Sequence, residues 1–219
     1  MGVVFEAFRE GVLWWADERL LCVADLHLEK GSSFARRGQM LPPYDTGETL
    51  ARLATLIDLL QPQTVVALGD SFHDDDGAHH LQPRNRAALA ALQAGRDWIW
   101  IAGNHDPHLP DGIGGHRLDE LTVGPLAFRH EPAPGPADGE IAGHLHPAAR
   151  VVGRGKSVRR RCFAGDGYRL ILPAFGAYAG GLDVRDAAFA GLFRKGSFRA
   201  FVLGDEGVYP VGLRALKAG

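Results

Sequence analysis

The first half of the chain alternates short apolar runs with amphipathic segments. Apolar residues recur every three or four positions in 45–62 and in 84–95, which predicts two helices with one apolar face each. Short apolar runs bounded by turn residues precede, separate and follow these helices, and predict strands. The expected strands are 11–15, 20–25, 64–70 and 97–106. This order of strands and helices predicts a parallel sheet with helices packed on its faces, after an initial hairpin.

The pattern changes after Asp106, where glycine and proline become frequent and no long helical period follows. Alternating runs joined by turn residues predict hairpins over 120–131, 159–173 and 197–211. Residues 140–147 predict a short strand that leads into a loop. The second half is therefore expected to be mostly antiparallel. The proline- and glycine-rich residues 132–139 are too few to separate two domains, so we expect a single domain over 1–219.

Composition narrows the class of protein. Hydrophobic residues make up 46% of 219 residues, enough for a substantial core, and the net charge of −2 argues against a wholly basic nucleic-acid binder. Cys22 and Cys162 are too few for a disulfide framework or a cysteine zinc site. No apolar run is long enough to span a membrane, and the N-terminus lacks the layout of a signal peptide. We therefore expect a cytoplasmic protein with no membrane partner.

The predicted strands that end in polar loops end in residues that commonly bind metals. These residues are Asp25, His27, Asp70, Asn104, His105, Asp106, His130, His144 and His146. Each group alone also fits a helix cap, a turn or a strand surface. Their shared place after strands favours one common site, because open α/β sheets bind ligands outside the carboxyl ends of their strands.

The spacing of these residues adds to this interpretation. His144 and His146 are two positions apart, as are Asp25 and His27, so in an extended strand each pair would share a face. Carboxylates, an amide and imidazoles together suit two divalent metals of intermediate softness. Two such ions lie about 3.5–4 Å apart in hydrolases, and Asp70, from the middle motif, is the natural residue to bridge them.

The ordered motifs "DLH", "GD", "GNHD", a later histidine and "GHLH", within residues 25–146, resemble the signature of calcineurin-like metallophosphoesterases. The longer segments "ADLHLEKGSSFARRG", "LGDSFHD" and "LPAFGAYAGGL" resemble one subgroup, the DNA ligase-associated metallophosphoesterases, which are proposed DNA-damage-response endonucleases. The resemblance implies an α/β fold, a four-layer α/β/β/α sandwich with mixed sheets. It also implies a functional association with a DNA ligase and a helicase.

The resemblance further implies how the site residues divide. One metal would be held by Asp25, His27, Asp70 and His146. The second would be held by Asp70, Asn104, His130 and His144. His105 would face the substrate and assist the leaving oxygen while Asp106 orients its ring, and a bridging hydroxide would attack phosphorus. Manganese is the first expectation for both ions, and iron or zinc would suit the same donors.

A basic run follows the "GHLH" loop and could bind a nucleic-acid backbone or form a solvated surface. It contains Arg150, Arg154, Lys156, Arg159, Arg160 and Arg161.

We expect a two-metal phosphodiesterase that acts as a nuclease on DNA in repair. The alternatives are a phosphoesterase for a small nucleotide or nucleotide-lipid substrate, and a catalytically inactive interaction module on the same fold. The complete set of candidate ligands speaks against the inactive module.

Overall fold

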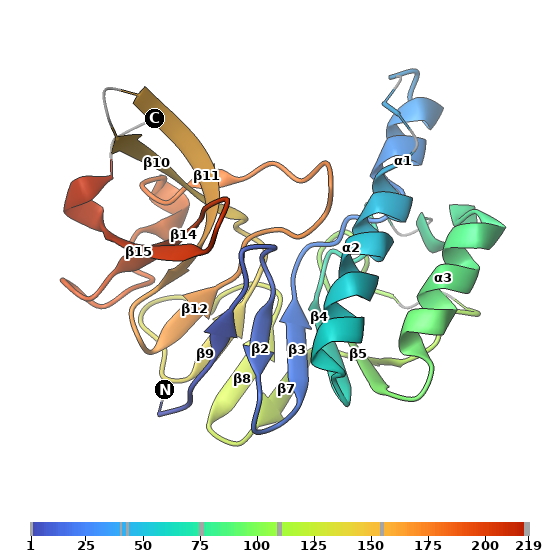
Figure 1. Cartoon of the computed structure of the whole chain (residues 1–219), viewed down its shortest axis with the longest axis horizontal. Coiled ribbons are helices and arrows are strands. Elements are labelled where there is room, and N and C mark those ends of the chain that lie inside the picture. Colours follow the sequence, from blue (N-terminus) through green and yellow to red (C-terminus); the bar gives the residue numbers. More distant parts are fainter. Residues whose placement is uncertain are drawn as a thin grey trace.

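The computed structural model describes residues 2–39, 41–42, 44–74, 77–108, 111–153 and 156–216 (Figure 1). The first half of the chain forms a six-stranded sheet. In spatial order its strands are β1 (Glu6–Ala7), β2 (Leu13–Trp15), β3 (Leu20–Val23), β4 (Thr64–Leu68), β5 (Asp97–Ile101) and β6 (His116–Leu118). Strands β1 to β3 are antiparallel neighbours and β3 to β6 are parallel. The predicted hairpin and parallel sheet are therefore confirmed.

The two predicted helices are present as α2 (Asp45–Leu60) and α3 (Pro83–Gln93). Helix α1 (Lys30–Arg36) and the 3-10 helix η1 (Gly77–His80) were not predicted. The first turn of helix α1 contains Gly31, Ser32 and Ser33, which favour a helix only weakly, so its sequence carries little helical signal. Tertiary contacts stabilise it instead: the Asp74 carboxylate accepts hydrogen bonds from Ser33 at 2.7 Å and Arg36 at 3.0 Å.

The second half forms a sheet of nine strands. They are β7 (Glu120–Val123), β8 (Leu126–Arg129), β9 (Glu140–Ala142), β10 (Pro147–Gly153), β11 (Lys156–Gly165), β12 (Arg169–Ile171), β13 (Leu182–Asp183), β14 (Arg199–Leu203) and β15 (Val208–Gly212). The predicted hairpins β7–β8, β11–β12 and β14–β15 are confirmed. However, β9 lies between β8 and β12 and is parallel to both, and β13 is parallel to β10. The sheet is thus mixed, because long connections return these strands in the same direction.

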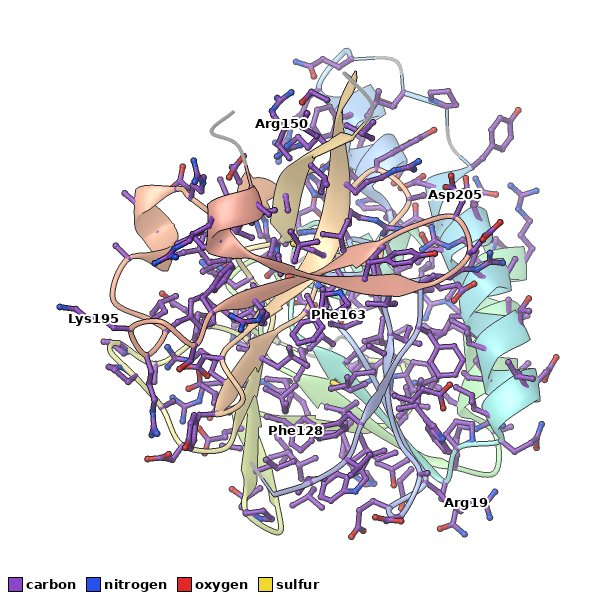
Figure 2. The ribbon with its side chains drawn as sticks, turned by 60° about the vertical axis from the view of Figure 1, so that its left-hand side comes forward. Arg19, Phe128, Arg150, Phe163, Lys195 and Asp205 are labelled. Carbon is purple, nitrogen blue, oxygen red and sulfur yellow. The ribbon has the colours of Figure 1, made fainter. Side chains whose placement is uncertain are left out.

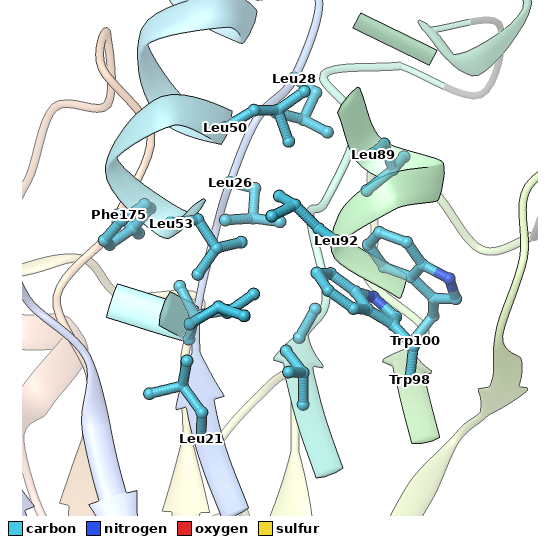
Figure 3. Close-up of a cluster of buried hydrophobic side chains, with 14 of the residues drawn as sticks. Leu21, Leu26, Leu28, Leu50, Leu53, Leu89, Leu92, Trp98, Trp100 and Phe175 are labelled. Carbon is cyan, nitrogen blue, oxygen red and sulfur yellow. The ribbon is translucent and has the colours of Figure 1, made fainter. Parts of the chain in front are cut away.

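The layers of the molecule are defined by three hydrophobic clusters. The first lies between the six-stranded sheet and helices α2 and α3, and includes Leu53, Leu89 and Trp98 (Figure 3). The second joins the two sheets face to face, with Phe128 and Phe163 fully buried in it (Figure 2). The two sheets therefore share one central core, and α2 and α3 form one outer layer.

The opposite outer face of the molecule carries the fourth layer of the expected sandwich in a reduced form. The third hydrophobic cluster covers the outer face of the second sheet, and Val184 and Phe189 contribute to it from outside. Within the described residues, the short 3-10 helices η2 (Ala187–Phe189) and η3 (Leu213–Ala215) and irregular chain lie there, and no α-helix does. The α/β class with two mixed sheets is confirmed, and its fourth layer is reduced. No described helix combines the length and apolar character needed to cross a membrane.

Candidate metal centre

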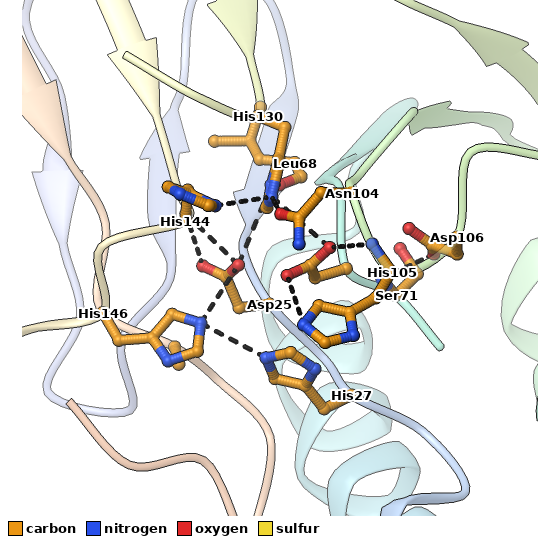
Figure 4. A network of polar contacts seen from close by, with 12 residues as sticks. Asp25, His27, Leu68, Ser71, Asn104, His105, Asp106, His130, His144 and His146 are labelled. Carbon is orange, nitrogen blue, oxygen red and sulfur yellow. Dashed lines mark hydrogen bonds and ion pairs between the residues drawn. The ribbon is translucent and has the colours of Figure 1, made fainter. Parts of the chain in front are cut away.

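The predicted ligands gather where the carboxyl ends of strands from both sheets meet (Figure 4). Three of the loops follow β3, β4 and β5 of the first sheet, and the other two follow β8 and β9 of the second. The His130 ring joins the two edges, because its Nδ1 lies 2.9 Å from the Leu68 carbonyl oxygen at the end of β4. The packing of the two sheets therefore creates the site, and neither sheet contains all of its residues.

The first cluster of candidate ligands consists of Asp25, His27, Asp70 and His146, each of which offers a ligand atom within 4.8 Å of the others. The Nε2 atoms of His27 and His146 face each other at 3.2 Å, and Nε2 of His146 lies 3.2 Å from Oδ1 of Asp25. Nδ1 of His27 is buried without a hydrogen-bond partner among the described residues. Converging nitrogen and carboxylate donors of this kind fit a divalent transition metal.

The second cluster consists of Asp70, His130 and His144. Nε2 of His130 lies 3.1 Å from Nδ1 of His144, 3.4 Å from Oδ1 of Asp70 and 2.9 Å from Oδ1 of Asn104. Asn104 is thus placed to complete this set. Asp70 belongs to both clusters, which is the geometry that a bridging ligand requires.

The backbone of the ligand loops differs from the extended strand expected from the spacing. Strands β3 and β9 end before the ligands, at Val23 and Ala142. Five candidate ligands have left-handed backbone conformations with φ between 44° and 69°: Asp25, His27, Asp70, His144 and His146. Such conformations are costly for residues other than glycine and concentrate at functional sites. His144 and His146 reach different clusters because of these tight turns, and strand alternation is not the cause.

Burial sets the charge state of the candidate ligands. Desolvation, with a smaller contribution from the neighbouring His146, lowers the pKa of His27 to about 2. Desolvation followed by the charge of His130 also lowers the pKa of His144. Both rings are therefore neutral at physiological pH, and the neutral imidazole is the form that binds metals. The donor set fits two divalent ions, with Asp25 and Asp70, which are 0% and 3% exposed, supplying the negative charge.

At two glycines the backbone packs so closely against the ligand loops that a side chain would not fit. A Cβ atom at Gly103 would lie 2.1 Å from the Asp70 backbone nitrogen, and one at Gly176 would lie 2.3 Å from the Leu26 carbonyl oxygen. Gly176 belongs to a loop, 173–178, whose residue pattern did not predict a place at the site. Its backbone donates to the Asp25 carbonyl at 3.2 Å and therefore supports the first ligand loop. The "LPAFGAYAGGL" segment was the available signal, since it contributed to the subgroup resemblance.

His105 lies at the rim of the centre and belongs to neither cluster of ligands. Its side chain is 44% exposed, and its Nε2 is 3.9 Å from Oδ2 of Asp70. Its backbone N–H donates to Oδ1 of Asp70 at 3.0 Å, which fixes the position of the residue beside the shared ligand. The ring is therefore accessible to a substrate placed over the two clusters.

Asp106 does not make the contact with the His105 ring that the resemblance implied. Its Oδ2 accepts hydrogen bonds from the backbone N–H groups of Ser71 at 2.7 Å and Phe72 at 3.0 Å, and its Oδ1 has no partner among the described residues. The side chain is buried beneath the loop that carries Asp70, and burial raises the pKa of its carboxyl to about 7. Asp106 is therefore placed to hold the Asp70 loop.

Replacing Asp106 by alanine is expected to lower the free energy of unfolding by about 2 kcal/mol or more, because two buried N–H groups lose their acceptor. Asp106→Asn should be milder, since a single oxygen accepts both bonds and an amide retains one. Urea unfolding of both variants, with exposed Asp97→Asn as a control, measures the difference. Equal stability of Asp106→Ala and the wild type would show that these two hydrogen bonds do not support the loop.

The residues of the basic run do not act as one surface. Arg161 points inward and donates to the Ala174 carbonyl oxygen at 2.7 Å, within the 173–178 loop that supports Asp25. Arg159 donates to the Gly181 carbonyl oxygen, and Arg160, on the other face of β11, forms an ion pair with Asp205 at 3.2 Å. Arg154 and the side chain of Lys156 lie outside the described residues. Only part of the predicted run is therefore available to a ligand beside the metal centre.

Comparison with known proteins gives two findings. A family model described as calcineurin-like phosphoesterase matches residues 18–172, which contain every candidate ligand. Among solved structures, the chain is similar to the nuclease MPE of Pseudomonas putida, with 28% sequence identity, a TM-score of 0.73 and coverage of 96% of each chain. None of the curated proteins matches the chain.

Proposed function

The chain belongs to the calcineurin-like phosphoesterase family and is a metal-dependent phosphoesterase, and we propose that it is a nuclease that hydrolyses phosphodiester bonds in DNA. The observation that carries the proposal is the pair of clusters that share Asp70, at a site formed by both sheets. The similarity to the Pseudomonas putida nuclease, which extends over 96% of both chains, supports a nucleic acid as the substrate.

The roles of the residues follow from their positions. Asp25, His27, Asp70 and His146 would hold one ion, and Asp70, Asn104, His130 and His144 the other. When bound, two such ions supply a hydroxide nucleophile at neutral pH and offset negative charge that develops on the phosphate. His105 would face the leaving oxygen and donate a proton to it. Asp106 would keep the Asp70 loop in place through the bonds to Ser71 and Phe72.

We propose manganese as the metal, because the mixture of imidazole, carboxylate and amide donors suits it. Iron and zinc fit the same donors and are the alternatives. A role in DNA repair, association with a ligase and a helicase, and a cytoplasmic location rest on the resemblance of the sequence to the ligase-associated subgroup and stay predictions.

The proposal is tested by measuring hydrolysis of bis-p-nitrophenyl phosphate, a mononucleotide and labelled single- and double-stranded DNA with manganese, iron and zinc in turn. We expect cleavage of the diester and of DNA with at least one of these metals. Hydrolysis of the mononucleotide and the small diester without any cleavage of DNA would favour the small-substrate alternative. Absence of all hydrolysis with both metals bound would favour the inactive module.

Part of the basic run is proposed to bind the DNA backbone. Arg159 and Arg150 are paired across β11 and β10, so their side chains share a face. The carbonyl that Arg159 contacts belongs to Gly181, whose own backbone approaches His146: a Cβ there would lie 2.5 Å from the His146 carbonyl oxygen. This face therefore adjoins the metal centre, whereas Arg160 lies on the opposite face of β11.

The substitution Arg159→Gln is expected to weaken DNA binding and to reduce the salt dependence of log Kd by about 0.7–0.9, the change for one lost phosphate contact. Arg160→Gln, the adjacent residue on the other face, is the matched control and should change neither quantity. Hydrolysis of bis-p-nitrophenyl phosphate should stay unchanged in both variants, because that substrate is too short to reach Arg159. Equal salt slopes for the two variants would contradict the proposed contact.

A further inference from the structure

A row of rings extends from the metal centre along helix α1. The His73 ring stacks on His105 with centroids 5.7 Å apart and an interplanar angle of 17°. The ring of Phe34, on α1, is the next in the row, and its centroid lies 5.5 Å from that of His73. His73 also contacts His27 edge-on at 5.9 Å, so the row begins at a candidate ligand and ends on the helix. His73 and Phe34 are absent from both ligand clusters.

Phe34 is not explained by packing of the core. It is half-buried and belongs to none of the three hydrophobic clusters. The helix that carries it is nevertheless fixed to the His73 loop, because Asp74 binds both Ser33 and Arg36. The structure thus holds an accessible aromatic side chain at a defined place beside the metal centre.

A lysine accompanies these rings. The Lys30 ammonium lies 5.9 Å from the centroid of the Phe34 ring and donates to the Tyr178 carbonyl oxygen at 3.2 Å. It forms no ion pair with a carboxylate of the described residues. Burial lowers its pKa, and Asp45 only partly opposes that effect. A partly desolvated ammonium that is paired only with a carbonyl retains the capacity to bind an anion.

We propose that Phe34, His73 and Lys30 form a nucleoside subsite next to the scissile phosphate. The base of the neighbouring nucleotide stacks on the Phe34 ring at the end of the row, where His73 supports that ring, and Lys30 binds the phosphate on the far side of that nucleotide. This inference rests on the proposed nuclease function and adds to it a group that binds a base of any identity. Stacking of one base on an aromatic side chain contributes about 1–3 kcal/mol, and every base offers a ring face, so the subsite requires an unstacked base and tolerates any sequence.

The test uses labelled oligothymidylate in which one nucleotide carries no base. Cleavage of each bond is quantified from the product lengths, so bonds far from the abasic position serve as an internal reference. In the wild type, the bond beside the abasic nucleotide should be cleaved about 5- to 150-fold more slowly than the reference bonds. In Phe34→Leu, which keeps apolar volume but removes the ring, this ratio should approach one. Tyr209→Leu removes an exposed ring on β15 and should behave like the wild type.

Lys30 is tested by binding, which does not depend on hydrolysis. Fluorescence anisotropy of labelled oligothymidylate with Lys30→Gln should show a slope of log Kd against log salt that is smaller by about 0.7. The control Lys195→Gln changes an exposed lysine far along the chain and should leave the slope unchanged.

If oligothymidylate is cleaved but the ratio of cleavage beside the abasic nucleotide to cleavage at the reference bonds is the same in Phe34→Leu and the wild type, the subsite is wrong and the nuclease function stands. If the wild type cleaves no nucleic acid although it hydrolyses bis-p-nitrophenyl phosphate, both proposals are overturned.

Discussion

Replacing Asp70 by asparagine is expected to reduce phosphodiester hydrolysis by more than about 10³-fold, because the enzyme can no longer hold both ions that stabilise the transition state. Asp70 is the residue shared by the two ligand clusters, and it is buried. A neutral amide has about the same size as the carboxylate but supplies no charge to offset two dications. The backbone should survive the change, since the amide oxygen can still accept the bond from the His105 N–H.

Metal analysis after dialysis, together with hydrolysis of bis-p-nitrophenyl phosphate, measures the effect of Asp70→Asn. We expect two ions per chain in the wild type and fewer in the variant. Asp97→Asn makes the same chemical change at an exposed position and should keep both ions. Two ions retained by Asp70→Asn with the affinity of the wild type would contradict the bridging role.

The sequence predicted most of the elements that build the site, because their signals are local. The apolar spacing of α2 and the β-branched run of β4 depend on one segment each, and both elements formed as expected. The candidate ligands could be grouped because parallel strands end at a common edge, so residues after β3, β4 and β5 must lie near one another. The single domain over 1–219 stays a prediction.

The features that could not be predicted depend on contacts between distant segments. Alternation in a strand suggested that His144 and His146 reach the same site from one face. Left-handed turns at both residues position them instead. The sequence does not reveal such turns, because glycine, the residue that usually marks them, is absent at those positions. Arg161 appeared to continue a basic surface with Arg159, which shares its face of β11, yet it donates to the Ala174 carbonyl oxygen because the distant 173–178 loop lies against it. The ring of Phe34 reached the site only because the unpredicted helix α1 is fixed to Asp74.

His105 lies at the rim of the centre, and its role in catalysis can be tested separately from metal binding. Replacing it by alanine is expected to leave both ions bound and to lower the turnover of DNA by about 10²–10⁴-fold, the usual contribution of an acid or base. Metal retention is expected because the ring belongs to neither cluster and its Nε2 is 3.9 Å from the nearest Asp70 oxygen. His116→Ala, on exposed β6, is the control and should have no effect.

The choice of substrate shows whether His105 donates a proton. The oxygen that leaves a DNA strand is a strongly basic alkoxide, whereas p-nitrophenolate is a stable anion that departs without protonation. A general acid therefore matters far more for DNA, and the loss in His105→Ala should be much smaller with bis-p-nitrophenyl phosphate. Equal losses on the two substrates would assign His105 to binding or positioning of the phosphate. Loss of an ion in the variant would contradict the separation of His105 from metal binding and would favour its assignment as a ligand.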